Sequence, residues 1–155
     1  MTPLGVSPIL RNRARLYSLR GADMKEVRVI HPDQLETEIS SGAMTRLAGI
    51  SQGTVGAEGI HLAIATVPPA CKSGAHWHTN CESAIYVLRG HGEFRVGEDL
   101  ETVLPIAPGD FIYVPAEAIH QPVNTSTTEP MELIVARNTP VELVVEYEPA
   151  SKSKA

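Results

Sequence analysis

Short runs of β-branched and apolar residues alternate with glycine and proline turns along most of this chain, and this punctuation constrains its fold more than any other feature. Turn signals such as Pro68-Pro69 and Pro108-Gly109 separate the runs. Regularly spaced short strands predict an all-β sandwich or barrel, including the jelly roll. We expect strands at residues 27–30, 60–67, 83–88, 93–96, 111–114, 131–136 and 141–147.

Only residues 32–41 have a helical pattern. Asp33 could cap this segment, and Leu35 and Ile39 are spaced so that they share one helix face. One short N-terminal helix is therefore expected beside the strands. The run at 60–67 is nearly all apolar, which predicts a strand that is covered on both faces.

The length of 155 residues corresponds to one domain that can bury a single core. Residues 1–24 carry several arginines and no acid before Asp23, so they could form a basic arm, a docking helix or a targeting segment. We favour a poorly ordered arm, and a start at Met24 is a further alternative. The interpretation is an arm at 1–24, one barrel at 25–149 and a disordered tail at 150–155.

A formal net charge of −5 argues against a nucleic-acid partner, because such partners select basic surfaces. The chain has no apolar run of about 18 residues and no visible secretory signal, so no membrane span is expected. The two cysteines, Cys71 and Cys81, make no disulfide framework. We therefore expect a cytoplasmic protein with reduced thiols.

Three histidines and one glutamate are the residues most indicative of chemistry. His76 and His78 are two positions apart, so on a strand their imidazoles point to the same face. Glu82 can return to that face if a turn intervenes, and His120 follows downstream. Imidazoles with a carboxylate form a typical site for Fe, Mn, Ni, Co, Cu or Zn. The residues therefore predict one divalent transition metal ion held by His76, His78, Glu82 and His120.

With these residues the chain resembles the cupin superfamily, most closely the single-domain RmlC-like proteins with a cupin 2 conserved barrel. The first cupin motif is G-x5-H-x-H-x3-4-E-x6-G and the second is G-x5-P-x-G-x2-H-x3-N. The resemblance implies a cupin jelly roll, also called a double-stranded β-helix barrel. The matching residues are His76, His78, Glu82 and Gly90 in the first motif, and Gly109, Pro115, His120 and Asn124 in the second.

The sequence departs from these motifs at three points. Ala70 replaces the leading glycine, and Glu117 replaces the glycine that follows the motif proline. Seven residues rather than six separate Glu82 from Gly90, so Ser83 occupies the alternative register of the ligand. Because serine is a poor metal ligand, we assign the carboxylate of Glu82 to the site and expect a bulge to absorb the extra residue.

The resemblance implies a metal-dependent oxidoreductase of the dioxygenase type that acts on a small organic substrate. A metal-dependent sugar or small-acid isomerase or lyase is one alternative, and a non-catalytic cupin that binds a small molecule is another. Thiol dioxygenases of this fold usually hold their metal with three histidines, so Glu82 argues against that narrower reaction. The sequence leaves open whether the protein is an enzyme, and identifies no catalytic residue beyond the ligands.

Four further residues are candidates to line the pocket. Tyr86 and Tyr113 could do so through their hydroxyls, and Arg95 and Asn124 are polar groups near the motifs. For Asn124 we favour a side chain that stabilises a turn. A barrel of this size leaves edge strands and an apolar sheet face, so we expect a homodimer.

Overall fold

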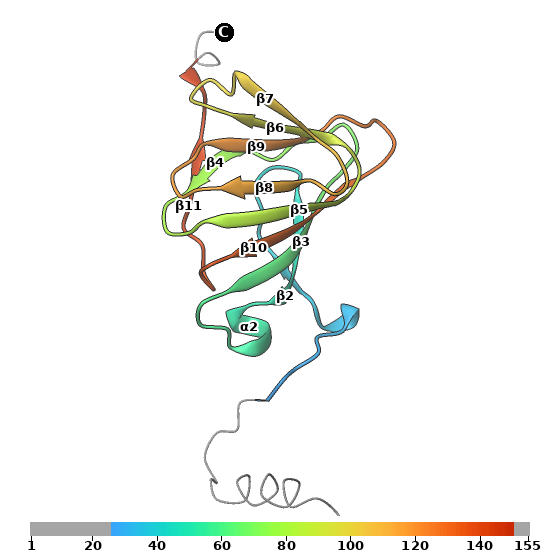
Figure 1. The fold of residues 1–155 in the computed structure, drawn as a ribbon, viewed down its shortest axis with the longest axis vertical. Coiled ribbons are helices and arrows are strands. Elements are labelled where there is room, and N and C mark those ends of the chain that lie inside the picture. Colours follow the sequence, from blue (N-terminus) through green and yellow to red (C-terminus); the bar gives the residue numbers. More distant parts are fainter. Residues whose placement is uncertain (1–25, 151–155) are drawn as a thin grey trace, which may run out of the picture.

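Two antiparallel sheets face each other and form a jelly-roll barrel (Figure 1). The computed structural model describes residues 26–150. One sheet has the strand order β1 (Glu36–Glu38), β2 (Thr45–Ile50), β3 (His61–Val67), β10 (Met131–Arg137), β5 (Ser83–Arg89) and β8 (Phe111–Val114). The other has the order β11 (Val144–Tyr147), β4 (Ala75–His78), β9 (His120–Asn124), β6 (Gly92–Val96) and β7 (Thr102–Ile106).

The core lies between the sheets and follows from alternation along the strands. In β3, every second residue from His61 to Val67 is buried, and β5 repeats this pattern from Ser83 to Val87. Both sheets contribute to one apolar cluster. Its members are Ala65, Val67, Ile85, Val87, Phe94, Ile106, Val114, Met131 and Leu133.

The predicted all-β class is confirmed, and six of the seven predicted runs contain an observed strand. The run at 27–30 does not, because these residues are extended but pair with no strand among those described. Strands β1, β2, β4, β7 and β9 are additions to the predicted runs. The run at 60–67 forms β3 as expected, but the expectation that both faces are covered is wrong, because Leu62 is 40% exposed.

The helix predicted at 32–41 is wrong. Only Pro32–Gln34 form a 3-10 turn, and β1 follows directly and pairs with β2. Ile39 is 97% exposed, so the apolar stripe that suggested a helix has nothing to pack against. The α-helix that does form, α2 (Gln52–Val55), is a single turn capped by Ser51 at its start and by left-handed Gly56 at its end.

The outer face of the six-stranded sheet exposes large apolar side chains. Phe111 is 83% exposed and Tyr113 is 64% exposed, and Leu47, Leu62 and Leu88 are each about 40% exposed or more. Such a face fits the homodimer predicted from the sequence, which stays a prediction.

The predicted arm at 1–24 and, apart from Ala150, the predicted tail at 150–155 lie outside the described residues. Cys71 and Cys81 are free thiols. Within residues 26–150, the helices are all too short to pass through a bilayer.

Candidate metal centre

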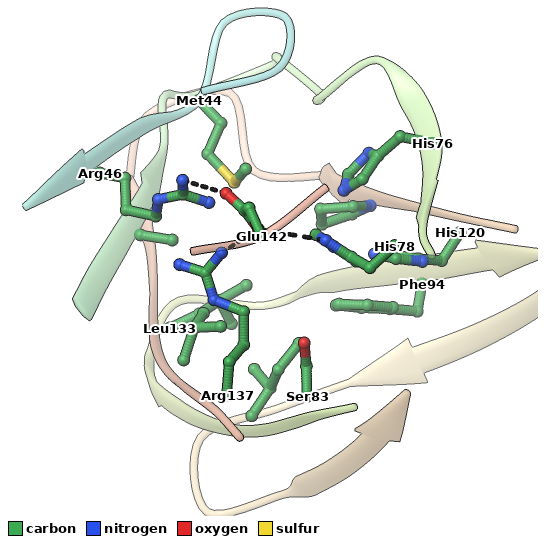
Figure 2. A pocket seen from close by; sticks show the side chains of 14 residues that line it. Met44, Arg46, His76, His78, Ser83, Phe94, His120, Leu133, Arg137 and Glu142 are labelled. Atoms are coloured by element: carbon green, nitrogen blue, oxygen red, sulfur yellow. Dashed lines mark hydrogen bonds and ion pairs between the residues drawn. The ribbon is translucent and has the colours of Figure 1, made fainter. Parts of the chain in front are cut away.

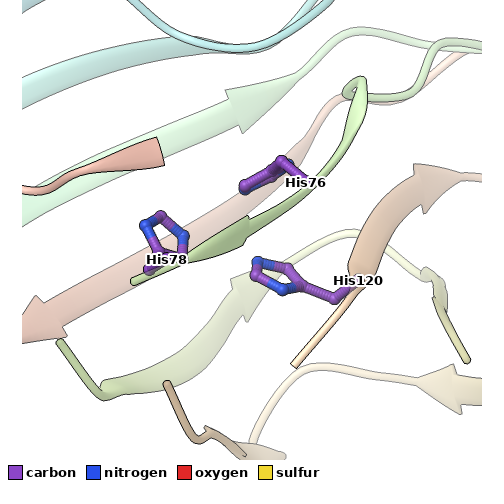
Figure 3. Close-up of side chains that lie close together, drawn as sticks. All are labelled: His76, His78 and His120. Atoms are coloured by element: carbon purple, nitrogen blue, oxygen red, sulfur yellow. The ribbon is translucent and has the colours of Figure 1, made fainter. Parts of the chain in front are cut away.

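His76, His78 and His120 form a compact triad inside the barrel (Figure 3). The first two lie on β4, and His120 begins β9, where it is the direct cross-strand partner of His76. Each histidine offers one nitrogen, and the three nitrogens lie within 4.8 Å of one another. The ring centroids are 4.4 to 5.3 Å apart, and all three side chains are buried.

The second nitrogen of each ring has a defined partner, and this orients the triad. Nδ1 of His76 donates to the carbonyl oxygen of Gly74 at 2.9 Å, and Nδ1 of His120 donates to that of Ala118 at 2.8 Å. Nδ1 of His78 lies 3.1 Å from Oε2 of Glu142. With Nδ1 engaged in all three residues, the lone pairs of the Nε2 atoms remain for a metal ion.

The surroundings of His76 and His120 favour neutral imidazoles. Burial is the main cause that lowers the pKa of His120 to about 3, and the neighbouring His76 adds to this effect. Burial likewise lowers the pKa of His76. Metal ligation needs unprotonated histidine, so these two residues are in the correct ionisation state at neutral pH without any rearrangement.

The structure does not bring Glu82 to the triad, which corrects the predicted four-residue site. Glu82 is exposed on the outside of the barrel, where Oε1 accepts a hydrogen bond from the hydroxyl of Tyr113 at 3.0 Å. β5 starts at Ser83, which pairs with Val114 of β8 and points inward. The alternative register is therefore the observed one. The expected irregularity is present, as a register shift of β5 between Val87 and Arg89, but it leaves Glu82 outside. Within residues 26–150 no carboxylate joins the three histidine nitrogens.

The four residues predicted to line the pocket lie elsewhere. Tyr86 faces outward and packs on Phe111, with ring centroids 5.0 Å apart. Arg95 pairs with Glu93 on β6, and Tyr113 is exposed. Asn124 is buried and stabilises a turn, as the sequence favoured: its amide donates to the carbonyl oxygens of Val67 and Glu129.

A group that we call the charged cluster closes the mouth of the barrel beside the triad (Figure 2). Arg46 of β2 and Arg137 of β10 both form ion pairs with Glu142, which lies between β10 and β11. Arg46 also pairs with Glu38 at 2.7 Å. His61 bridges the other side, because its Nε2 donates to Glu38 at 2.7 Å and its Nδ1 accepts from Arg137 at 2.9 Å.

Glu142 is held as a carboxylate in this cluster. Burial would raise its pKa, but the contact with His78 and the charges of Arg137 and Arg46 outweigh burial and keep the pKa well below its ordinary value. Glu142 therefore links the two groups: it lies 3.1 Å from Nδ1 of His78 and pairs with both arginines.

The sequence pattern did not predict Arg46, Arg137 or Glu142 as site residues, although it holds one signal for Arg137. In β10 the inward residues alternate from Met131 through Leu133 to Arg137, so an extension of the predicted strand by one residue would have pointed a guanidinium inward. No local pattern indicates that Glu142 reaches this arginine.

The motif glycines mark backbone geometry. Gly90 and Gly109 have φ of 79° and 99°. Ala70 and Glu117 replace motif glycines, and both still adopt left-handed backbone with φ of 54° and 64°. The amide of Glu117 donates to the carbonyl oxygen of His78 at 2.8 Å, so this strained turn ties the second motif to the first.

The comparison with protein families finds a match to the cupin domain model (Cupin_2) over residues 63–137. This range contains the triad and both motifs, and the observed fold agrees with it. The chain is a cupin. A comparison of this cupin with curated proteins finds no match.

Solved structures show the same fold at low sequence identity. The polyketide cyclase RemF from Streptomyces resistomycificus has 20% identity and a TM-score of 0.67, with 84% of this cupin and 94% of the other chain covered. A sugar phosphate isomerase of the cupin superfamily from Silicibacter pomeroyi has 21% identity and a TM-score of 0.62, with 78% and 82% covered. An oxalate decarboxylase from Lactobacillus farciminis has 20% identity and a TM-score of 0.64, with 89% and 49% covered, so this cupin spans about half of that chain.

The three histidines of this cupin could hold a metal ion. Their buried nitrogens converge, their rings are oriented by second partners, and neutral imidazole is a ligand for the transition metals from iron to zinc. With three protein ligands, coordination positions remain open toward the interior.

Proposed function

We propose that this cupin is a metal-dependent oxidoreductase of the dioxygenase type that acts on a small organic substrate. The supporting observation is the triad itself, in which three buried imidazoles and no carboxylate of the described residues converge. Such a ligand set leaves several positions of an octahedral ion open. When bound there, a redox-active metal would supply Lewis acidity and electrons to substrate and dioxygen.

The walls of the cavity support chemistry that begins at the metal. Phe94, Leu133 and Ile85 form the apolar part of the lining beside the triad, and apolar walls limit the water that can reach a reacting centre. Among the described lining residues the only carboxylate is Glu142, and two arginines and His78 already engage it. The cavity thus offers no unengaged carboxylate as a general base, which disfavours proton transfer as the main task.

Oxygen uptake tests the proposal. The protein is analysed for metals as purified, then loaded with Fe(II) without air and mixed with a panel of enolic, phenolic and thiol compounds. Thiols belong in the panel because Glu82, which as a metal ligand would argue against a thiol dioxygenase, lies outside the site. We expect oxygen uptake on admission of air with at least one compound, and none with His120→Ala. A loaded protein that consumes no oxygen across the panel would contradict the proposal.

A redox-neutral isomerase or lyase is the second candidate, because one observation favours it. Arg46 and Arg137 line the cavity together with the triad, and guanidinium groups there could stabilise an enediolate or other developing anion. Turnover that persists without oxygen and with redox-inert Zn would establish this alternative. Ligand-induced thermal stabilisation without turnover would indicate a binding protein instead.

A further inference from the structure

The inner cavity beside the triad is too small for an organic substrate. It has a volume of about 40 Å³, which is room for only a few water-sized molecules. A hollow of about 120 Å³ on the side of Ser41 and Glu146 also reaches His76 and His78. The larger groove, of about 450 Å³ on the side of Glu36 and His61, touches none of the three histidines, so access to the triad from this groove requires a side chain to move.

Glu142 is positioned to be that side chain. It lines the inner cavity, the hollow and the groove, so its displacement would join all three (Figure 2). It lies in the segment 138–143, which belongs to no strand. Its neighbours Val141 and Leu143 are 54% and 57% exposed, whereas the Glu142 side chain is 11% exposed. This surface segment thus turns its charged residue inward and its apolar residues outward.

Displacement of Glu142 would leave two buried cations without their shared counterion. The side chains of Arg137 and Arg46 are 2% and 12% exposed, and only Glu38 would remain to balance them. A buried charge that loses its partner is strongly destabilising. The group that replaces Glu142 must therefore bring negative charge, and the space it inherits has the size and shape of a carboxylate.

On this basis, and resting on the proposed function, we propose that the substrate is a small organic acid. Its carboxylate takes the place of Glu142 between Arg46 and Arg137. Arginine forks match a carboxylate in bidentate geometry. The same carboxylate would accept a hydrogen bond from Nδ1 of His78, because Glu142 Oε2 now lies 3.1 Å from that atom. The acid would then lie beside the imidazole of His78, one of the three residues that would hold the metal.

Acetate is the probe, and the full-length protein is titrated while backbone amide NMR shifts are recorded. Glu142 competes with added acetate, so the apparent affinity of the natural protein is reduced by the fraction that is open. We expect Glu142→Gln to bind acetate on the order of tenfold more tightly. The double variant Arg46→Gln/Glu142→Gln removes one charge of each sign, which keeps the cluster balanced, and should lose this gain.

Arg89→Gln is the matched control, because Arg89 pairs with Glu132 on the surface and is 63% exposed. It should bind acetate as the natural protein does, and uncharged acetamide should not bind to any variant. Unchanged acetate affinity in Glu142→Gln, or equal binding of acetamide, would overturn the proposal. Tighter binding of inorganic phosphate than of acetate would overturn the carboxylate class.

His120→Ala/Glu142→Gln separates this inference from the proposed function. Acetate binding in this variant should persist, because the arginines are intact while the metal ligand is lost. Loss of binding would assign the acetate to the metal and overturn the arginine site. Acetate binding without oxygen uptake for any compound of the panel would contradict the proposed dioxygenase activity and support the carboxylate site.

Discussion

The triad and the charged cluster meet where His78 approaches Glu142, yet the two groups are assembled in different ways. In the triad, His76 and His120 are each oriented by a carbonyl two residues earlier in the chain. In the charged cluster, several partners are far apart in the chain: His61 and Glu38 by 23 positions, Arg137 and His61 by 76, and Arg46 and Glu142 by 96. Local geometry thus fixes the metal ligands, whereas the closed mouth depends on the whole barrel.

The largest expected effect tests whether metal binding depends on the three histidines. His120→Ala should lower metal affinity by more than about 100-fold, because it removes one of three ligands and exceeds the loss typical of residues behind a ligand. Elemental analysis after dialysis measures this. Glu82→Gln is the control and should retain the metal, since Glu82 lies on the outside with Tyr113. Unchanged metal content in His120→Ala would remove this residue from the site.

Arg137→Gln tests whether the cluster holds the barrel together. The change leaves Glu142 and Glu38 with Arg46 as their only guanidinium partner, so we expect the free energy of unfolding to fall by about 3–5 kcal/mol. Urea denaturation gives the value. Arg89→Gln removes an exposed pair and should leave the free energy of unfolding nearly unchanged. Equal losses in the two variants would show that the cluster contributes nothing special to stability.

As the pH falls, the triad and the charged cluster should lower the free energy of unfolding in different pH ranges. The unfolded chain protonates His120 near its ordinary pKa of 6.5, but the folded chain does so only near 3. The unfolded state thus binds more protons in this window, and the free energy of unfolding falls by about 1.4 kcal/mol per pH unit per histidine as the pH drops below 6.5.

The lowered pKa of Glu142 acts in the same direction but only below its ordinary value of 4.5. Denaturation of metal-free protein between pH 6.5 and 5 therefore isolates the histidines. His120→Gln should show a smaller slope there than the natural protein, and an identical slope would rule out a buried neutral His120.

The smallest effect concerns the two strained motif positions. Glu117→Gly and Ala70→Gly each relieve a left-handed backbone, and after the added entropy of the unfolded chain we expect a gain of about 0.5 kcal/mol each. Thermal denaturation measures it. Ala84→Gly, in the exposed part of β5, should instead lose about 1 kcal/mol. A loss of the same size at Glu117 would mean that its side chain contributes more than its backbone costs.

The sequence predicts whatever depends on neighbours within a few residues. The strands and the three histidines follow from alternation and motif spacing, and the observed fold confirms the class. Glu82 could not be placed in the same way, because one extra residue before Gly90 shifts which side chain points inward. The pairing of Ser83 with Val114 decides this, and Val114 lies 31 residues downstream.

The arginine site could not be predicted for a related reason. Arg137 ends β10 and Glu142 follows in the next loop, but Arg46 lies on β2, and only the pairing of the strands brings it to Glu142, 96 positions away. The helix predicted at 32–41 failed because its stripe has no partner, so the segment gains more from pairing with β2.

The five-stranded sheet is weakly paired between β4 and β9, and the histidines of the triad lie on both of these strands. Within these strands β4 and β9 share a single register pair, His76 with His120, whereas β9 and β6 share five. An ion held by both imidazoles would cross-link β4 and β9. Metal occupancy would then govern the lifetime of the closed barrel as well as its chemistry, and amide hydrogen exchange in β4 and β11 would slow when the ion is bound.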